Sequence, residues 1–510
     1  MDVYAKKLRF AGFARRCKLV LSAALGISLL FLCTVPVAQA FVHVDSNNNT
    51  PTNDIVAPGF DNQSSIAKIP TQYISEDYRQ AYARKIAENI LAKVNGKASV
   101  GIKLQSVKNG EVMFAQNTHK LLVPASNAKI FTAVAALTYL GPDYVFNTQL
   151  LTSPKTVLAN NQNTLNGDLY VKFSGDPSLT SADLSQLFAT LKQRGINRIN
   201  GHVYIDDSVF SGSSLGPGWL WTDTRYCYSA PISGVIIDHN CPRFLYQPKA
   251  NKVAYNCGHK FSKRGSKHVR RKSCLRVRHK ASPYYVQRVL HNPHEYAKGL
   301  VDQLLAQQHI SVTGEISRAS ANKNMQIVAS HRSEPLSELL TKMLKESDNL
   351  FADAIFKKLG SVYFDESGNW ENGSLAVKHI LTEKAHLNMN NLRLVDGSGM
   401  SRYNLVTADE VTDLLNYAYH RLPYATDFIQ ALPVGGIDGT LARRMHKMDL
   451  RGRVRAKTGT MHSVTALSGY LETTHDDVLV FSIIFNGFYG SGRYYRAISD
   501  ELLTESARRL

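Results

Sequence analysis

The stretch LLVPASNAKIFTAVAALTYL, residues 121–140, decides the architecture of the chain. Its first residues, up to Pro124, indicate a strand end and a turn, and an apolar helix is predicted from about Ser126. Residues three apart in a first helical turn share one face, so the amine of Lys129 is expected beside the hydroxyl of Ser126. A serine needs an adjacent base to become a nucleophile, and a lysine with a lowered pKa can serve. An ordinary helix-capping serine is the alternative, and it is the simpler explanation of this motif alone.

Two further short motifs follow far along the chain. Ser347-Asp348-Asn349 lies in a stretch predicted to be helical from Ser333 to Leu359, and Lys457-Thr458-Gly459-Thr460 ends a strand-like run. Each motif is weak by itself, because polar residues on a helix surface and glycines at strand ends are common. A glycine at that strand end would let a ligand approach the backbone closely.

Taken together and in this order, Ser-x-x-Lys, Ser-x-Asn and Lys-Thr-Gly resemble the signature of serine β-lactamases and penicillin-binding proteins. The long interval between the first two motifs resembles the class C low-molecular-mass penicillin-binding proteins, which are D-alanyl-D-alanine carboxypeptidases and endopeptidases of the S13 peptidase type. Four other segments carry the same resemblance: Ser174–Leu179 (SGDPSL), Gly218–Trp221 with Tyr228–Pro231 (GWLW and YSAP), Asp396–Arg402 (DGSGMSR) and Leu432–Leu441 (LPVGGIDGTL). The resemblance covers about residues 78–510 and does not include the basic stretch near 257–280.

The fold that this resemblance implies is α+β. We expect a transpeptidase domain of the penicillin-binding and β-lactamase type, with an antiparallel sheet covered by helices and a large β-rich insertion between the Ser-x-x-Lys and Ser-x-Asn motifs. The expected division of the chain is a signal peptide at 1–40, a polar arm at 41–75, catalytic parts at 76–150 and 326–510, and the insertion at 151–325. Within the catalytic parts the patterns predict strands at Ser99–Val107, Glu111–Gln116, 453–458, 462–472 and 477–487, and helices at 78–94, 407–420 and 493–509.

The resemblance also implies a role for each motif residue. Ser126 would be the acylated nucleophile, Lys129 its base, and Ser347 a relay that passes a proton to the leaving amine. The remaining implied roles are amide binding by Asn349, positive potential from Lys457, binding of the terminal carboxylate by Thr458, close approach at Gly459, and an oxyanion hole from the backbone N–H groups of Ser126 and Thr460. Asp176 and Arg402 would hold the diamino-acid side chain of the stem peptide. A turn-forming aspartate and a surface ion pair are the alternatives for those two residues.

The N-terminus predicts export. Residues 1–18 are basic, residues 19–37 are apolar, and Ala38-Gln39-Ala40 is a small-residue cleavage pattern, as in a secretory signal peptide. The apolar run is also long enough to be an uncleaved anchor, which is the alternative. We therefore expect a periplasmic protein, peripherally associated with a membrane in one version of this hypothesis.

Charge and cysteine content fit an exported chain. The formal net charge is +19 at pH 7, which indicates an anionic partner, and export argues against nucleic acid. Outside the leader an even number of cysteines suggests two disulfides, and the two short pairings Cys227–Cys241 and Cys257–Cys274 are favoured over the other connectivities. A zinc site is the weaker alternative, since no two of these cysteines have C-x-x-C spacing.

The stretch Lys260–Lys280 is the most basic part of the chain. It holds ten Lys or Arg residues, and no acidic residue occurs from His239 through His294. A solvated loop of the insertion is one interpretation, and a surface that docks on an anionic membrane or on cell-wall carboxylates is the other.

The predicted function is a periplasmic serine D,D-carboxypeptidase and D,D-endopeptidase that acts on peptidoglycan stem peptides and binds β-lactam antibiotics. No metal or cofactor is expected, and the oligomeric state is open, a dimer included. A serine β-lactamase-like hydrolase and a catalytically silent cell-wall-binding scaffold are the alternative functions.

Overall fold

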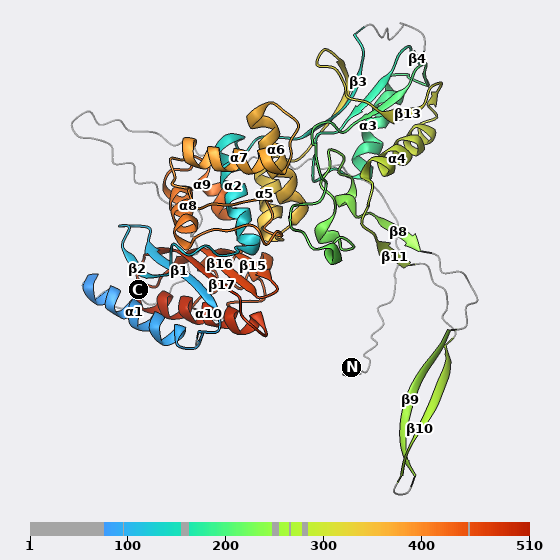
Figure 1. Cartoon of the computed structure of the whole chain (residues 1–510). Coiled ribbons are helices and arrows are strands. Elements are labelled where there is room, and N and C mark those ends of the chain that lie inside the picture. Colours follow the sequence, from blue (N-terminus) through green and yellow to red (C-terminus); the bar gives the residue numbers. More distant parts are fainter. Residues whose placement is uncertain are drawn as a thin grey trace, which may run out of the picture. The chain divides into compact units, whose positions relative to one another are not determined.

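The computed structural model describes residues 76–94, 96–154, 163–246, 254–264, 267–277, 284–446 and 449–510 (Figure 1). The predicted signal peptide and polar arm lie outside the described residues. Within the described part of the chain, no helix has both the length and the apolar character that crossing a membrane requires.

A five-stranded antiparallel sheet combines strands from early and late parts of the chain, in the order β15-β16-β17-β1-β2. Its strands are β1 (Ser99–Ser106), β2 (Val112–Gln116), β15 (Val454–Met461), β16 (Val464–Glu472) and β17 (Val478–Asn486). The strands predicted here are confirmed, with ends that differ by a few residues. Nearly all of β16 and β17 is buried, because helices cover both faces of the sheet.

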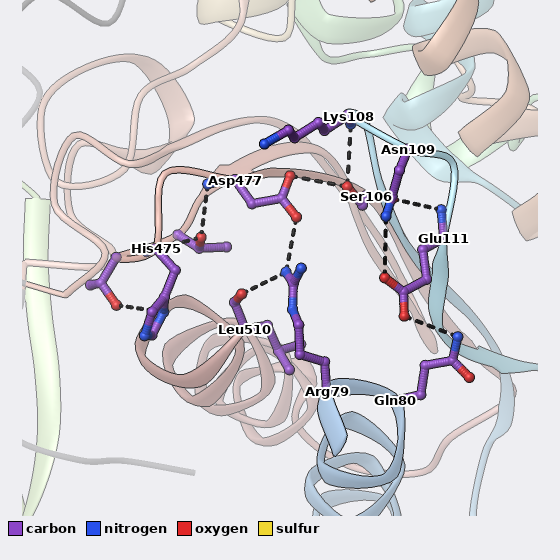
Figure 2. Close-up of polar contacts among 11 residues, drawn as sticks. Arg79, Gln80, Ser106, Lys108, Asn109, Glu111, His475, Asp477 and Leu510 are labelled. Atoms are coloured by element: carbon purple, nitrogen blue, oxygen red, sulfur yellow. Dashed lines mark hydrogen bonds and ion pairs between the residues drawn. The ribbon is translucent and has the colours of Figure 1, made fainter. Parts of the chain in front are cut away.

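Helices α1 (Glu76–Leu91) and α10 (Gly492–Arg509) cover one face, and their apolar residues share a core with the sheet (Figure 1). Polar contacts fasten α1 at one end of this layer (Figure 2). Arg79 donates hydrogen bonds to Asp477 Oδ2 at 2.9 Å and to the carbonyl oxygen of Leu510 at 2.6 Å. Asp477 also accepts from Ser106 Oγ at 3.0 Å, so one buried carboxylate joins α1, β1 and the segment before β17.

The opposite face carries a larger helical layer around α2 (Ala128–Tyr139), which is buried over most of its length. The 3-10 turn η1 (Ala125–Asn127) leads into α2. The other elements of this layer are α5 (Leu336–Lys345), α6 (Asn349–Phe364), α7 (Trp370–His379), η5 (Ile380–Lys384), α8 (Ala408–His420), α9 (Ala425–Ala431) and η6 (Gly439–Leu441). The motif residues enter the site from the start of α2, from between α5 and α6, and from β15.

The inserted region has its own core and two more sheets. One sheet has the order β13-β7-β5-β3-β14 and the other the order β12-β6-β4. Their strands are β3 (Asn147–Thr152), β4 (Thr164–Leu165), β5 (Leu169–Lys172), β6 (Arg198–Ile199), β7 (Val203–Asp206), β12 (Ser311–Val312), β13 (Ile316–Arg318) and β14 (Gln326–Arg332). Helices α3 (Ser181–Gln193) and α4 (Pro293–Gln307) pack in the same core, so the region is mixed α/β where the sequence predicted mainly strands. The strands of these two sheets extend from Asn147 to Arg332, a few residues beyond the predicted bounds 151–325 at each end.

Two antiparallel ribbons leave this region, β8 (Arg243–Tyr246) with β11 (Tyr284–Gln287) and β9 (Ala254–Arg264) with β10 (Lys267–Val277). The backbone register of the second ribbon sets Cys257 opposite Cys274. Between the insertion and the catalytic part lie three short 3-10 turns, η2 (Trp221–Asp223), η3 (Cys227–Ser229) and η4 (Asp238–Asn240). A disulfide joins Cys227 to Cys241, whose Cα atoms are 5.6 Å apart.

Candidate active site

Ser126 stands at the entrance of α2 in a strained turn. The preceding Ala125 has φ +48°, in the left-handed region that residues with a Cβ seldom adopt. Gly399 (φ +81°) closes over this turn, and a Cβ at Gly399 would lie 1.8 Å from the carbonyl oxygen of Ala125. Only glycine therefore lets the DGSGM segment approach the serine turn so closely.

Lys129 is one turn further along the same helix face, as the spacing predicts. Its Nζ lies 3.1 Å from Ser126 Oγ, 2.7 Å from Asn349 Oδ1 and 2.6 Å from the carbonyl oxygen of Ser398. Burial lowers the pKa of Lys129 to about 8, although the carboxylates of Asp353 and Asp396 act in the opposite direction. A tenth or so of the amine is then neutral at pH 7, which lets it accept a proton from the serine.

The Ser347-Asp348-Asn349 motif lies in a turn between two helices, and not inside a continuous helix as predicted. Helix α5 ends at Lys345, Ser347 has φ +60°, and Asp348 caps α6 by accepting from the backbone N–H of Phe351 at 3.1 Å. With this break both Ser347 and Asn349 line the same cleft, whereas residues two apart in an uninterrupted helix do not share a face.

Lys457 joins the third motif to the second. Its Nζ donates to Ser347 Oγ at 2.7 Å and to the carbonyl oxygen of Thr458 at 3.0 Å. Burial, with the neighbouring charge of Lys129, holds the pKa of Lys457 well below its usual range. The site therefore contains two serine–lysine pairs, each with an amine whose pKa is lowered by burial.

Strand β15 places the rest of the third motif beside the nucleophile. A Cβ at Gly459 would lie 2.6 Å from the carbonyl oxygen of Pro124, so glycine lets the strand pass close to the serine turn. Thr458 Oγ1 donates to Thr440 Oγ1 at 2.8 Å, and Thr460 is exposed on the cleft.

Two buried carboxylates support the segment between the motifs. Asp353 Oδ1 accepts from the backbone N–H groups of Gly397 and Ser398 at 2.8 and 2.9 Å, and Asp396 accepts from Trp219 Nε1 at 2.9 Å. Burial, and the neighbouring Asp396, raise the pKa of Asp353 well above its usual range. These contacts fix the Ser398 carbonyl that receives a hydrogen bond from Lys129.

These groups open onto a cleft with a volume of about 460 Å³. Ser126, Ser347, Asn349 and Thr460 line it, and Lys129 and Lys457 are fully buried behind its wall. A cleft with a serine nucleophile, a nearby amine base and a second serine–lysine pair is suited to acyl transfer.

Of the two residues expected to bind the stem peptide, the structure brings only Arg402 to the cleft. Arg402 lines it and donates from Nη2 to the carbonyl oxygen of His462 at 2.7 Å. Asp176 is buried and is not among the residues that line the cleft, and its Oδ1 accepts from the backbone N–H and Oγ of Ser178 at 2.8 and 2.6 Å. Its Oδ2 is buried without a hydrogen-bond partner among the described residues, so the turn accounts for only one of its two oxygens.

The acidic residue of the cleft is Asp223, which the sequence interpretation did not single out. It lies in the GWLW to YSAP block, and Tyr228 OH donates to its Oδ1 at 3.0 Å. Position within that block was the available signal, but nothing in the sequence distinguishes Asp223 from Asp176 as a ligand. Only the folded chain brings Asp223 and Arg402 to one cavity.

Comparison with known proteins agrees with this geometry. A family model described as the D-Ala-D-Ala carboxypeptidase 3 (S13) family matches residues 83–505. The chain belongs to this family. It is similar to the D-alanyl-D-alanine carboxypeptidase DacB of Haemophilus influenzae, with 30% identity over 436 residues that cover 80% of this chain and 89% of that protein. It is also similar to a D-alanyl-D-alanine carboxypeptidase of Actinomadura sp., with 31% identity over 429 residues, 76% of this chain and 78% of that protein.

Solved structures place this S13 chain in the same fold. Penicillin-binding protein 4 from Haemophilus influenzae aligns with a TM-score of 0.70 and 28% identity, over 82% of this chain and 97% of that one. A structure of the same protein complexed with a β-lactam aligns with a TM-score of 0.66 and 26% identity, over the same shares of the two chains. The family and the α+β fold predicted from the three motifs are therefore confirmed.

Proposed function

We propose that this S13 family member hydrolyses the D-Ala-D-Ala bond of peptidoglycan stem peptides through an acyl-enzyme on Ser126. The observation that carries the proposal is the 3.1 Å contact between Ser126 Oγ and the buried amine of Lys129, whose pKa is lowered to about 8. The two relatives named as D-alanyl-D-alanine carboxypeptidases support the substrate.

In the proposed reaction Ser126 Oγ attacks the carbonyl carbon of the penultimate D-alanine, and Lys129 receives the hydroxyl proton. The C–N bond breaks, and Ser347, hydrogen-bonded to Lys457, donates a proton to the departing nitrogen of the terminal D-alanine. The backbone N–H groups of Ser126 and Thr460 would stabilise the oxyanion. Water then attacks the ester carbonyl and gives a proton to Ser347. Lys129 returns its proton to Ser126 Oγ as the ester bond breaks, so the acid product leaves and the enzyme is restored. A cross-linking D-amino acid as the leaving group gives the endopeptidase reaction by the same steps.

Substrate recognition would be divided between two ends of the cleft. Thr458 and the positive potential of Lys457 would hold the carboxylate of the leaving D-alanine. At the other end, Asp223 and Arg402 provide an anion and a cation that match the amine and the carboxylate of a diamino-acid side chain. Asp223 thus takes the place in this proposal that the sequence interpretation gave to Asp176.

A β-lactam would acylate the same serine, because opening its ring is also an attack on an amide carbonyl. The test is labelling of residues 41–510 with a fluorescent penicillin, beside the Ser126→Ala variant. We expect a stable label that Ser126→Ala abolishes, with release of D-alanine from a stem pentapeptide and cleavage of a cross-linked dimer. A label lost within seconds would favour the β-lactamase alternative, and no Ser126-dependent label would favour the wall-binding scaffold.

We also propose that residues 1–40 export the chain to the periplasm, where its substrate lies. The pattern of basic, apolar and small residues supports this, and the N-terminal sequence of the mature protein tests it: a start at Phe41 is expected, and an intact leader would indicate an anchor.

The basic stretch Lys260–Lys280 is proposed to dock on an anionic surface. Eight Lys or Arg residues of this stretch lie on the ribbon of β9 and β10, and the ribbon β8–β11 exposes Tyr284 and Tyr285; both features support this proposal. Sedimentation with anionic lipid vesicles and with purified sacculi, at low and high salt, distinguishes the two sources of charge. Binding that is indifferent to salt would contradict it.

A further inference from the structure

An exposed group of apolar side chains adjoins the catalytic cleft. We name it the aromatic shelf; it consists of Leu220, Trp221, Tyr226 and Tyr228. Their exposed fractions are 53%, 84%, 45% and 49%. Large aromatic side chains bury much of their surface in most folded proteins, so several exposed ones within nine consecutive residues indicate a binding surface.

The aromatic shelf is braced and not a loose loop. The rings of Tyr226 and Tyr228 are stacked, with centroids 5.4 Å apart and planes 9° apart. Cys227, which lies between them, is held by the disulfide to Cys241. Ser229 Oγ donates to the carbonyl oxygen of Tyr226 at 3.0 Å. Because the rings of Tyr226 and Tyr228 are held before any ligand arrives, binding to these two rings costs little ordering entropy.

The aromatic shelf adjoins the catalytic residues. Leu220 and Tyr228 line the cleft that contains Ser126, and Trp221 follows Leu220 directly. Asn349 Nδ2 donates to the carbonyl oxygen of Tyr228 at 2.9 Å, so the shelf is attached to the second catalytic motif. Whatever covers the shelf is therefore adjacent to a peptide bound at the nucleophile.

The chemistry of the substrate indicates the occupant. A stem peptide in the cleft is joined at its other end to a chain of sugar rings, and a pyranose ring has an apolar C–H face edged with hydroxyl groups. Flat side chains with a polar tip, such as tyrosine and tryptophan, complement such a face. An anionic membrane would instead call for several cations, whereas the segment that carries the shelf, residues 220–228, contains one acid, Asp223, and one base, Arg225.

We propose that the aromatic shelf binds the glycan strand of peptidoglycan, so that the enzyme favours stem peptides still attached to sugar. This inference rests on the proposed function, since it assigns the shelf to the same substrate. Trp221 is the main element of the shelf because it is the most exposed of the four residues and, unlike Leu220, is not among the residues that line the cleft.

The first test compares two substrates with the same stem pentapeptide, one free and one attached to the disaccharide. Trp221→Ala should lower the ratio of kcat/KM between the sugar-linked and the free peptide about tenfold, the effect typical of losing one aromatic anchor. Trp221→Phe should retain most of the ratio. The matched control is Tyr78→Ala, which removes an exposed aromatic from α1, outside the shelf, and should leave the ratio unchanged. An unchanged ratio in Trp221→Ala would overturn the proposal.

A second test does not depend on catalysis. Chitohexaose, an oligomer of N-acetylglucosamine without peptide, should bind the Ser126→Ala protein measurably by calorimetry and bind the Ser126→Ala/Trp221→Ala protein at least about tenfold more weakly. Equal binding of both proteins, or binding by neither, would overturn the shelf proposal while penicillin labelling still stands. Sugar binding without Ser126-dependent labelling would instead overturn the proposed function and leave the shelf.

Discussion

The lowered pKa of Lys129 predicts how acylation depends on pH. With a pKa of about 8, roughly a tenth of this amine is neutral at pH 7, against about three in ten thousand for a lysine at 10.5. The environment of Lys129 thus makes the base about 300 times more available at pH 7. Raising the pH removes the proton from the Lys129 amine, so the rate of Ser126 acylation must rise with pH.

The assay is the second-order rate constant for acylation by a fluorescent penicillin between pH 6 and pH 10. We expect about a tenfold rise from pH 6 to pH 7 and a plateau above about pH 9, with an inflection near pH 8. The Lys129→Arg variant is the second test. A guanidinium stays protonated, so the acylation rate constant at pH 7 should fall by about 10⁴-fold or more. A flat profile, an inflection near 10.5, or an active Lys129→Arg variant would refute the assignment of Lys129 as the base.

Three further predictions concern residues around the site. His239 Nε2 lies 2.7 Å from Asp348 Oδ2. Burial raises the pKa of the Asp348 carboxyl, but the hydrogen bond and charge of His239 help to lower this pKa below its ordinary value. His239→Ala should slow penicillin acylation about tenfold, and His239→Arg should preserve it. Because the stability from a depressed carboxyl pKa is lost as the pH falls through that pKa, His239→Ala should also begin acid unfolding at a higher pH, and an identical acid transition would contradict this. Gly399→Ala should destabilise the fold by about 3 kcal/mol and abolish labelling, because its Cβ would meet the carbonyl oxygen of Ala125; a variant with native melting temperature and labelling would disprove the packing argument. Asp223→Asn should raise KM about tenfold for a stem peptide with a free side-chain amine and little for one whose amine is acetylated, so equal effects on both would argue against the ion pair.

The family, the order of the three motifs and the pairing of Ser126 with Lys129 could all be predicted from the amino-acid sequence. The Ser126–Lys129 contact follows from helical periodicity alone, because residues three apart share a face whatever the rest of the chain does. The strands of the catalytic sheet were also predictable, since their apolar runs are bounded by turn residues such as Asn109 and Gly110.

How the three motifs come together could not be predicted, because it depends on packing between distant parts of the chain. The positive φ of Ser347 depends on packing between α5 and α6, so the periodic pattern predicted a continuous helix across the motif. Lys457 reaches Ser347 across 110 residues of sequence, and no local rule specifies such a contact. The position of Asp223 is likewise tertiary: Asp176 and Asp223 both lie in family-like segments, but of these two only Asp223 lines the cleft, whereas Asp176 is buried. Local periodicity depends on neighbours in the chain, whereas the position of a charge in a cavity depends on everything that packs around it.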